Sequence, residues 1–278
     1  MAGKNLDPSS SPRALLGAEL RVAREAAGLS QAELGEPLFV SGSFIGQLEA
    51  GTRRMHIEFA RQIDDILSTN GFFVRNCGAA AKSKYPDHFA AAAEAEALAK
   101  AIREYAPQLI PGLLQTEAYA REVFRAYQPT APETAIDELV ENRLARAALL
   151  SDPTTPLLWC VLDEAVLRRV GENTAILAEA LRHVATLIRS HRVIVQVLPF
   201  SAGPHAGLDG SLKLMAFEDA PPLVYVDGIG MGQLFDDPAT VARHTLTYDL
   251  LTASALSPRR SLALIESVAE EYERDQHA

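Results

Sequence analysis

Cysteine is scarce in this sequence, which has only Cys77 and Cys160 among its 278 residues. Two cysteines cannot build a disulfide framework or a zinc site by themselves, so we expect a reducing compartment, the cytoplasm. Long apolar runs are also missing, because no stretch approaches the roughly 18 uninterrupted apolar residues of a membrane-spanning helix. The first residues, MAGKNLDPSSSPR, lack the apolar segment of a signal peptide, and their polar composition predicts a disordered tail over residues 1–12.

Catalytic motifs are a second absence. Neither a Gly-x-Ser-x-Gly nor a His-Glu-x-x-His sequence occurs, and the neighbouring carboxylates Asp163 and Glu164 suit a helix cap better than an acid/base pair. His205 lies in a glycine-rich loop with no cysteine or acidic residue spaced to complete a metal site, so a conformational or polar role is favoured over catalysis. The glycines of DGIGMG (227–232) lack the spacing of a phosphate-binding loop, which favours a flexible turn. We therefore expect no enzyme, no metal and no cofactor.

Basic residues are fewer than acidic ones, and the two kinds are distributed unevenly along the chain. The net charge is −10; residues 1–82 carry nine Lys/Arg and nine Asp/Glu, whereas residues 83–278 carry 17 and 27. An acidic chain is not a protein that coats nucleic acid in general. The balanced N-terminal part still permits a local DNA contact, and the length suits two domains.

The stretch LSQAELGEPLFVSGSFIGQLEAGTRR, residues 29–54, predicts a helix, a tight turn, a second helix and a basic exit. Ser30 with Glu33 three positions later is typical of a capping box. Ser41 is suited to cap the second helix. That helix has apolar residues at the spacing of one inward face, namely Phe44, Ile45 and Leu48.

The same stretch resembles the helix-turn-helix of the phage-repressor-like (XRE) family of transcription factors, over about residues 13–70. The resemblance implies that the second helix lies in the major groove of double-stranded DNA, where side chains read base edges. It places Gln31 on a phosphate, Ser43 and Gln47 on bases, and Gly42 on a third base-reading position without a side chain. The predicted DNA-binding residues are Gln31, Ser41, Gly42, Ser43, Gln47, Arg53 and Arg54.

Gly35 fits the family pattern, whereas Pro37 and Phe39 depart from it. Gly35 supplies the small residue that lets the two helices approach. Pro37 falls inside the first predicted helix and is expected to kink it, at a cost of ~3 kcal/mol in a regular helix. Phe39 occupies the usual turn glycine, where a left-handed conformation would cost ~1–2 kcal/mol.

The remaining chain changes character after about residue 153. Four β-rich runs, at 156–163, 192–199, 211–217 and 223–227, alternate with helical patterns. We predict an all-α helix-turn-helix domain over residues 13–75 and a linker over 76–87. An α+β domain with a small sheet of about four strands then occupies residues 88–278 and opens with a helix at 88–105.

Two segments of this larger domain, EYAPQLIPGLLQTEAYAREVF and VIVQVLPFSAGPHAGLDGSLKLMAF, are similar to the C-terminal domain of actinobacterial regulators labelled DUF5753 or Scr1-like antitoxin-type regulators. This resemblance covers about residues 90–272. It implies a transcriptional regulator paired with a small DUF397-type protein. The alternatives are an antitoxin that neutralises a small toxin-like partner, and a regulator that senses a small molecule. Because two base-reading side chains give little specificity, we expect a homodimer, joined through its C-terminal part, on a pseudo-palindromic operator.

Overall fold

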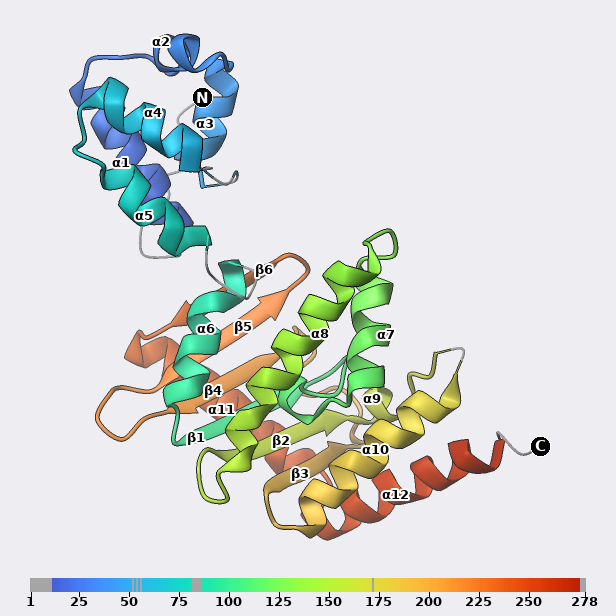
Figure 1. The fold of residues 1–278 in the computed structure, drawn as a ribbon. Helices are drawn as coiled ribbons and strands as arrows, with labels where there is room; N and C mark the ends of the chain where they lie inside the picture. The colour runs from blue at the N-terminus through green and yellow to red at the C-terminus, as the bar shows by residue number, and fades with distance from the viewer. Residues whose placement is uncertain are drawn as a thin grey trace. The chain divides into compact units, whose positions relative to one another are not determined.

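The computed structural model describes residues 12–51, 53, 55, 57–81, 87–171 and 173–275. The chain divides into two compact units, Met1–Ala91 and Ala92–Ala278 (Figure 1). The predicted tail lies outside the described residues except for Pro12, which begins the first helix, and so does the 82–86 part of the predicted linker. Within the described part of the chain, no helix combines the length and apolarity needed to cross a membrane.

The N-terminal unit is helical, as predicted. Its helices are α1 (Pro12–Ala26), α2 (Gln31–Gly35), α3 (Gly42–Glu49), α4 (Ile57–Leu67) and α5 (Phe72–Ala81). They enclose one core, made of Leu16, Leu20, Leu34, Leu38, Ile45, Leu48, Met55, Ala60, Ile63, Phe73 and Cys77. Helix α5 runs into the first residues of the predicted linker because Phe73 and Cys77 are buried in this core.

The second unit is built on a six-stranded mixed sheet with strand order β3-β2-β1-β4-β5-β6. The strands are β1 (Ala101–Ala106), β2 (Leu157–Asp163), β3 (Val193–Leu198), β4 (Leu212–Ala216), β5 (Leu223–Gly228) and β6 (Met231–Phe235). β1, β2 and β3 are parallel, and β4, β5 and β6 continue the sheet antiparallel from β1. The predicted α+β class is therefore confirmed.

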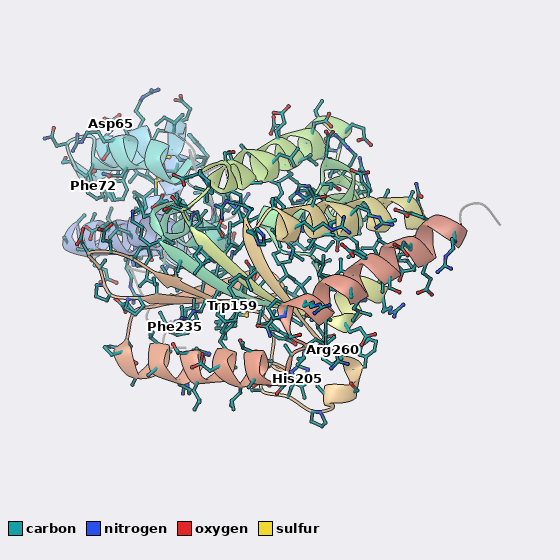
Figure 2. The ribbon with its side chains drawn as sticks, turned by 90° about the horizontal axis from the view of Figure 1, so that it is seen from below. Asp65, Phe72, Trp159, His205, Phe235 and Arg260 are labelled. Atoms are coloured by element: carbon teal, nitrogen blue, oxygen red, sulfur yellow. The ribbon has the colours of Figure 1, made fainter. Side chains whose placement is uncertain are left out.

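Helices cover both faces and one edge of this sheet, and the first of them, α6, contains the boundary between the two units. They are α6 (Asp87–Leu98), α7 (Glu117–Tyr127), α8 (Glu133–Ala147), α9 (Glu164–Arg168), α10 (Thr174–Arg189), α11 (Pro238–Ser254) and α12 (Pro258–Asp275). Figure 1 shows α6 and α8 across one face, and α11 runs along the other (Figure 2). At the β3 edge, the amide of Val197 donates to Ser261 Oγ of α12 at 2.9 Å, so the helix satisfies a group that an edge strand would leave open.

The sheet has two more strands than the sequence predicts. Residues 88–105 were expected to form one helix, but α6 ends at Leu98 and β1 takes its place between β2 and β4. The alanine-rich part of this stretch is helical, whereas residues 101–106 pair with β2 and β4, and this pairing outweighs their own helical propensity. The glycine segment expected to be only a flexible turn forms a hairpin: Gly230 has φ 68°, and β6 follows it at Met231.

The two faces of the sheet differ sharply in polarity. The face under α11 is apolar, with a core made of Tyr105, Val161, Leu198, Leu212, Leu214, Val224, Val241, Tyr248 and Leu251. On the opposite face, the registers place Cys160, Glu104, Lys213 and Tyr225 side by side across β2, β1, β4 and β5. An acidic and a basic side chain, those of Glu104 and Lys213, thus lie next to each other near the middle of a buried sheet surface.

These charges are balanced by neighbours from the covering helices. Lys213 Nζ lies 2.5 Å from Glu96 Oε2 of α6 and 3.2 Å from Glu104 Oε2, and Arg146 Nε of α8 lies 2.8 Å from Glu96 Oε1. Burial opposes ionisation of Glu96, but Lys213 and Arg146 outweigh it and lower the pKa of that carboxyl group. Burial raises the pKa of Glu104, and the nearby charge of Lys213 offsets this increase only in part. The cluster therefore anchors α6 and α8 to the sheet.

Removing the central cation of this cluster should be costly. The substitution Lys213→Met leaves the carboxyl groups of Glu96 and Glu104 buried without the ammonium group that contacts both. We therefore expect the free energy of unfolding to fall by about 3–5 kcal/mol. Urea unfolding followed by tryptophan fluorescence measures this, because the single tryptophan, Trp159, is in β2 of the same unit.

The matched control for this prediction is Lys100→Met. Lys100 Nζ lies 3.3 Å from Glu218 Oε2, but both side chains are more than half exposed. An exposed pair of this kind contributes about 0.2–1 kcal/mol. Equal losses from the two substitutions would contradict the structural role given to the buried cluster.

Candidate nucleic-acid interface

The two short helices at residues 31–49 are capped as the sequence predicts. The amide of Glu33 donates to Ser30 Oγ at 3.2 Å, and the amide of Ser30 donates to Glu33 Oε2 at 2.7 Å, which completes the capping box. These hydrogen bonds with Ser30 lower the pKa of Glu33. Ser41 Oγ accepts from the amide of Phe44 at 3.2 Å and caps α3. Both helix starts are therefore fixed by local side chains.

Small residues set how closely α2 and α3 approach. A Cβ on Gly35 would lie 2.6 Å from the carbonyl oxygen of Val40, so this glycine lets the turn before α3 pass close to the end of α2. A Cβ on Gly42 would lie 3.0 Å from the amide nitrogen of Ala32. Gly42, predicted as a base-reading position without a side chain, is thus the point at which α3 crosses the start of α2.

The turn between the helices differs from the prediction at Pro37. A kink inside the first helix was expected, but α2 ends at Gly35 and residues Glu36–Leu38 form a 3₁₀ turn with Pro37 in its first positions. The missing amide hydrogen costs little there, because the first turn of a helix does not use it. Phe39 then adopts the left-handed conformation with φ 55° and ψ 36°. Its side chain is 97% exposed, so no packing offsets the strain in the free protein.

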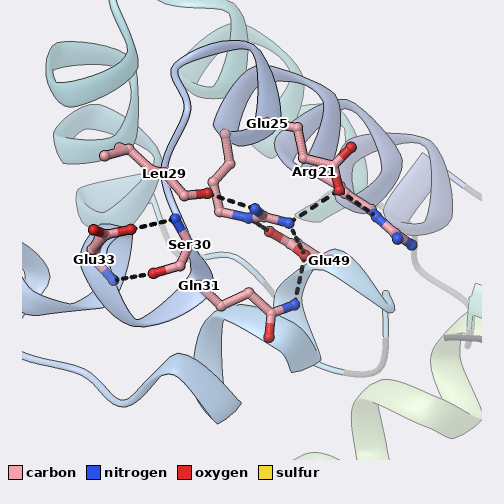
Figure 3. A network of polar contacts seen from close by, with 8 residues as sticks. Arg21, Glu25, Leu29, Ser30, Gln31, Glu33 and Glu49 are labelled. Atoms are coloured by element: carbon pink, nitrogen blue, oxygen red, sulfur yellow. Dashed lines mark hydrogen bonds and ion pairs between the residues drawn. The ribbon is translucent and has the colours of Figure 1, made fainter. Parts of the chain in front are cut away.

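A buried ion pair joins α1 to the end of α3 (Figure 3). Arg24 Nε donates to Glu49 Oε1, Arg24 Nη2 donates to Glu49 Oε2 at 3.2 Å, and Arg24 Nη1 donates to the carbonyl oxygen of Leu29 at 2.7 Å. Arg24 and Glu49 are only 7% and 6% exposed. The hydrogen bond to Glu49 raises the pKa of Arg24, so the guanidinium stays charged. The sequence pattern gives no sign of this pair, because nothing local links two residues 25 positions apart.

Gln31 belongs to the same network. Its Nε2 donates to Glu49 Oε2 at 2.8 Å, and its amide lies against Gly46, where a Cβ would come within 3.1 Å of Gln31 Oε1. The start of α2 is thereby tied to the middle and end of α3. One N–H of the amide is committed to Glu49, and a glutamine amide carries two.

The outward face of α3 holds the other predicted residues. Ser43 and Gln47 are exposed one helical turn apart, while Ile45 and Leu48 are buried on the opposite side. Arg53 joins this face: its Nη1 donates to Gln47 Oε1 at 3.4 Å. The Arg53 guanidinium also lies 4.4 Å from the centre of the Phe44 ring.

The structure therefore brings Ser43, Gln47 and Arg53 to one surface, with exposed Ser41 at its start. Gln31 lies beside this surface on α2. Arg54 lies outside the described residues.

In the second unit, the two residues weighed as catalytic candidates, Asp163 and His205, make local structural contacts. Asp163 caps α9 by accepting from the amide of Ala165 at 2.8 Å, as predicted. His205 Nδ1 accepts from the amide of Gly207 at 3.2 Å, and its Nε2 lies 3.6 Å from Asp163 Oδ2. These contacts fix the loop. In the described ranges, no three His, Cys, Asp or Glu side chains gather as metal ligands would.

Comparison with known protein families finds two matches. A family described as a domain of unknown function, DUF5753, matches residues 89–267, and a helix-turn-helix domain matches residues 15–71. Neither a curated protein nor a solved structure matches the chain. The second match coincides with the unit that carries the capped helices, the Arg24–Glu49 pair and the exposed face of α3.

Replacing Phe39 by glycine should stabilise the N-terminal unit. Glycine adopts the left-handed conformation freely, which recovers part of the ~1–2 kcal/mol that a side chain costs there. Glycine also gives the unfolded chain more freedom, so we expect a net gain of about 0.5–1 kcal/mol. Urea unfolding followed by far-ultraviolet circular dichroism measures it. Phe39→Ala, which keeps a Cβ at this position, should show no such gain, and a destabilised glycine variant would contradict the account.

Proposed function

Since the chain belongs to the DUF5753 family and carries a helix-turn-helix domain ahead of the family's region, we propose that it is a sequence-specific, DNA-binding transcriptional regulator. The observation that supports this most directly is the exposed face of α3, where Ser43 and Gln47 project from a helix held at both ends. A helix presented in this way fits the major groove.

Each side chain on that surface has a distinct role in the proposal. Gln47 reads one base edge through its amide, which pairs best with adenine, and Ser43 reads a neighbouring base. Arg53 contacts the phosphate backbone, and Gln31 directs its remaining N–H to a phosphate near the start of α2. Arg24 touches no DNA in this arrangement. It positions Gln31 through Glu49, which accepts hydrogen bonds from both.

The proposal includes a homodimer. Two reading side chains specify too few bases for one copy to find a unique site. A symmetric pair bound to half-sites about 34 Å apart, or a multiple of that, doubles the number of bases read and predicts a pseudo-palindromic operator.

We propose that the acidic second unit receives a small protein of the DUF397 type and thereby modulates DNA binding. Residues 83–278 hold the whole net charge of −10, which would steer a partner of opposite charge and repel DNA. The antitoxin role, the actinobacterial lineage and the cytoplasmic location rest on the resemblance and composition alone. A small-molecule sensor is the alternative function of this unit.

Substitutions at Gln47 and at Arg53 should distinguish base-specific contacts from contacts with the phosphate backbone. Gln47→Ala should cost ~1–3 kcal/mol of operator affinity at a single base position. Arg53→Ala, alone or with Arg54→Ala, should weaken binding to every sequence and reduce the salt slope by about 0.9 for each phosphate that is no longer neutralised. Fluorescence anisotropy over a salt series measures both, on an operator selected by the full chain from random duplexes.

Arg75→Ala is the control for these variants, because Arg75 lies on α5 and bonds the carbonyl oxygen of Asn70. It should leave operator affinity unchanged. A wild-type chain that selects no sequence would refute the proposed function. An Arg53/Arg54 variant that binds as tightly as wild type at every salt concentration would refute only the backbone assignment.

Partner binding should change operator affinity by the same factor by which the operator changes partner affinity, typically 1–3 kcal/mol. The measurement is a titration of operator with and without a DUF397-type protein, together with the reverse titration by calorimetry. Unchanged affinities in both directions, with no complex formed, would leave the small-molecule sensor as the better account of the second unit.

A further inference from the structure

Helix α11 carries apolar side chains on both of its sides. Val241, Tyr248 and Leu251 face the sheet and are buried. On the outer side, Leu246 is 59% exposed and Leu250 is 51% exposed. A surface helix normally turns a polar face outward, and Figure 2 shows α11 along its face of the sheet, with side chains projecting away from it.

The outer stripe is self-complementary about Leu246. The residues three and four positions away from Leu246 on either side are Ala242, Arg243, Asp249 and Leu250, and all four are exposed. Two such helices can cross antiparallel with Leu246 on the two-fold axis. A residue that lies n positions before Leu246 in one copy then faces the residue n positions after Leu246 in the other copy. Arg243 of one copy then faces Asp249 of the other, and Ala242 faces Leu250. Opposite charges meet, and a small side chain meets a large one, on both sides of the axis.

We propose that this outer face of α11, defined by Ala242, Arg243, Leu246, Asp249 and Leu250, is the surface through which two copies of the chain pair about a two-fold axis. An isologous contact requires a surface that matches itself in this way. A charged partner protein fits less well, because the stripe holds one positive and one negative residue and has no net charge. The inference rests on the homodimer in the proposed function and names its interface.

The contact is small, since each copy contributes one helix face, and interfaces at the low end of the size range are weak. A weak dimer suits a protein that meets two half-sites on one DNA molecule, because the tethered second copy binds at a high effective concentration. Within one copy, Asp249 Oδ1 lies 3.9 Å from Arg103 Nη1, and both side chains are about half exposed. That long pair leaves Asp249 able to meet Arg243 of a second copy.

The first test is sedimentation velocity on the full chain without DNA. The substitution Leu246→Glu places a carboxylate of each copy on the two-fold axis, where the two carboxylates face each other. It should raise the dimer dissociation constant at least tenfold, which corresponds to about 1.4 kcal/mol. The control is Leu98→Glu. Leu98 is 74% exposed at the end of α6, on the other face of the sheet, and its substitution should leave the dissociation constant unchanged.

The second test exchanges charges. Arg243→Asp and Asp249→Arg should each weaken self-association, because like charges then face across the axis. A mixture of the two single variants should form heterodimers, since each Asp of one chain faces an Arg of the other. The double variant should dimerise as wild type does, and circular dichroism establishes that every variant is folded.

The outcomes separate this inference from the proposed function. A wild-type chain that stays monomeric at its highest soluble concentration overturns the α11 interface, as does a dimer indifferent to Leu246→Glu. Single variants that fail to pair when mixed overturn it too. A dimer that follows these charge rules but selects no DNA sequence would support the interface and refute only the DNA-binding proposal.

Discussion

The buried pair between Arg24 and Glu49 is the constraint on which the N-terminal unit depends. Taking two charges out of water costs several kcal/mol for each ion, and their attraction repays this only when further hydrogen bonds satisfy both groups. Here the carbonyl oxygen of Leu29 and the amide of Gln31 supply those bonds. One short network thus joins α1, the loop after it, the start of α2 and the end of α3, so that the exposed face of α3 has a fixed orientation within its unit.

The second unit solves a related problem in a different way. Lys213 lies between Glu96 and Glu104 on a sheet face that helices cover, and Arg146 completes the balance. Both units therefore bury ionised groups at the junction of elements distant in sequence. A fully hydrogen-bonded polar network adds to the apolar packing, because charged groups that must meet allow few arrangements of the elements that carry them. On the opposite face, α11 packs over an apolar core, and a hydrogen bond from Tyr248 Oη to the carbonyl oxygen of Trp159 at 2.8 Å joins it to β2.

Local chemistry explains how much of this could be predicted from the sequence. The caps at Ser30, Ser41 and Asp163, and the inward set on α3, involve residues within four positions of one another, and all were found. The Arg24–Glu49 pair was missed because its partners meet only after the chain has folded. β1 was missed because its helical propensity is overruled by strands more than 50 residues away. The predicted DNA contacts of Gln31, Ser43, Gln47 and Arg53 remain proposals, since the free protein shows only where these side chains point.

The glycines of α3 limit which side chains the exposed face of this helix can carry. A side chain at Gly42 would press on the backbone of α2, and one at Gly46 would displace Gln31. A side chain at Gly42 therefore needs a shift of the α2 backbone, whereas one at Gly46 needs the Gln31 side chain to move. A new side chain on this face is therefore accommodated most easily at the exposed position Ser43, because the other exposed side chain, Gln47, accepts a hydrogen bond from Arg53.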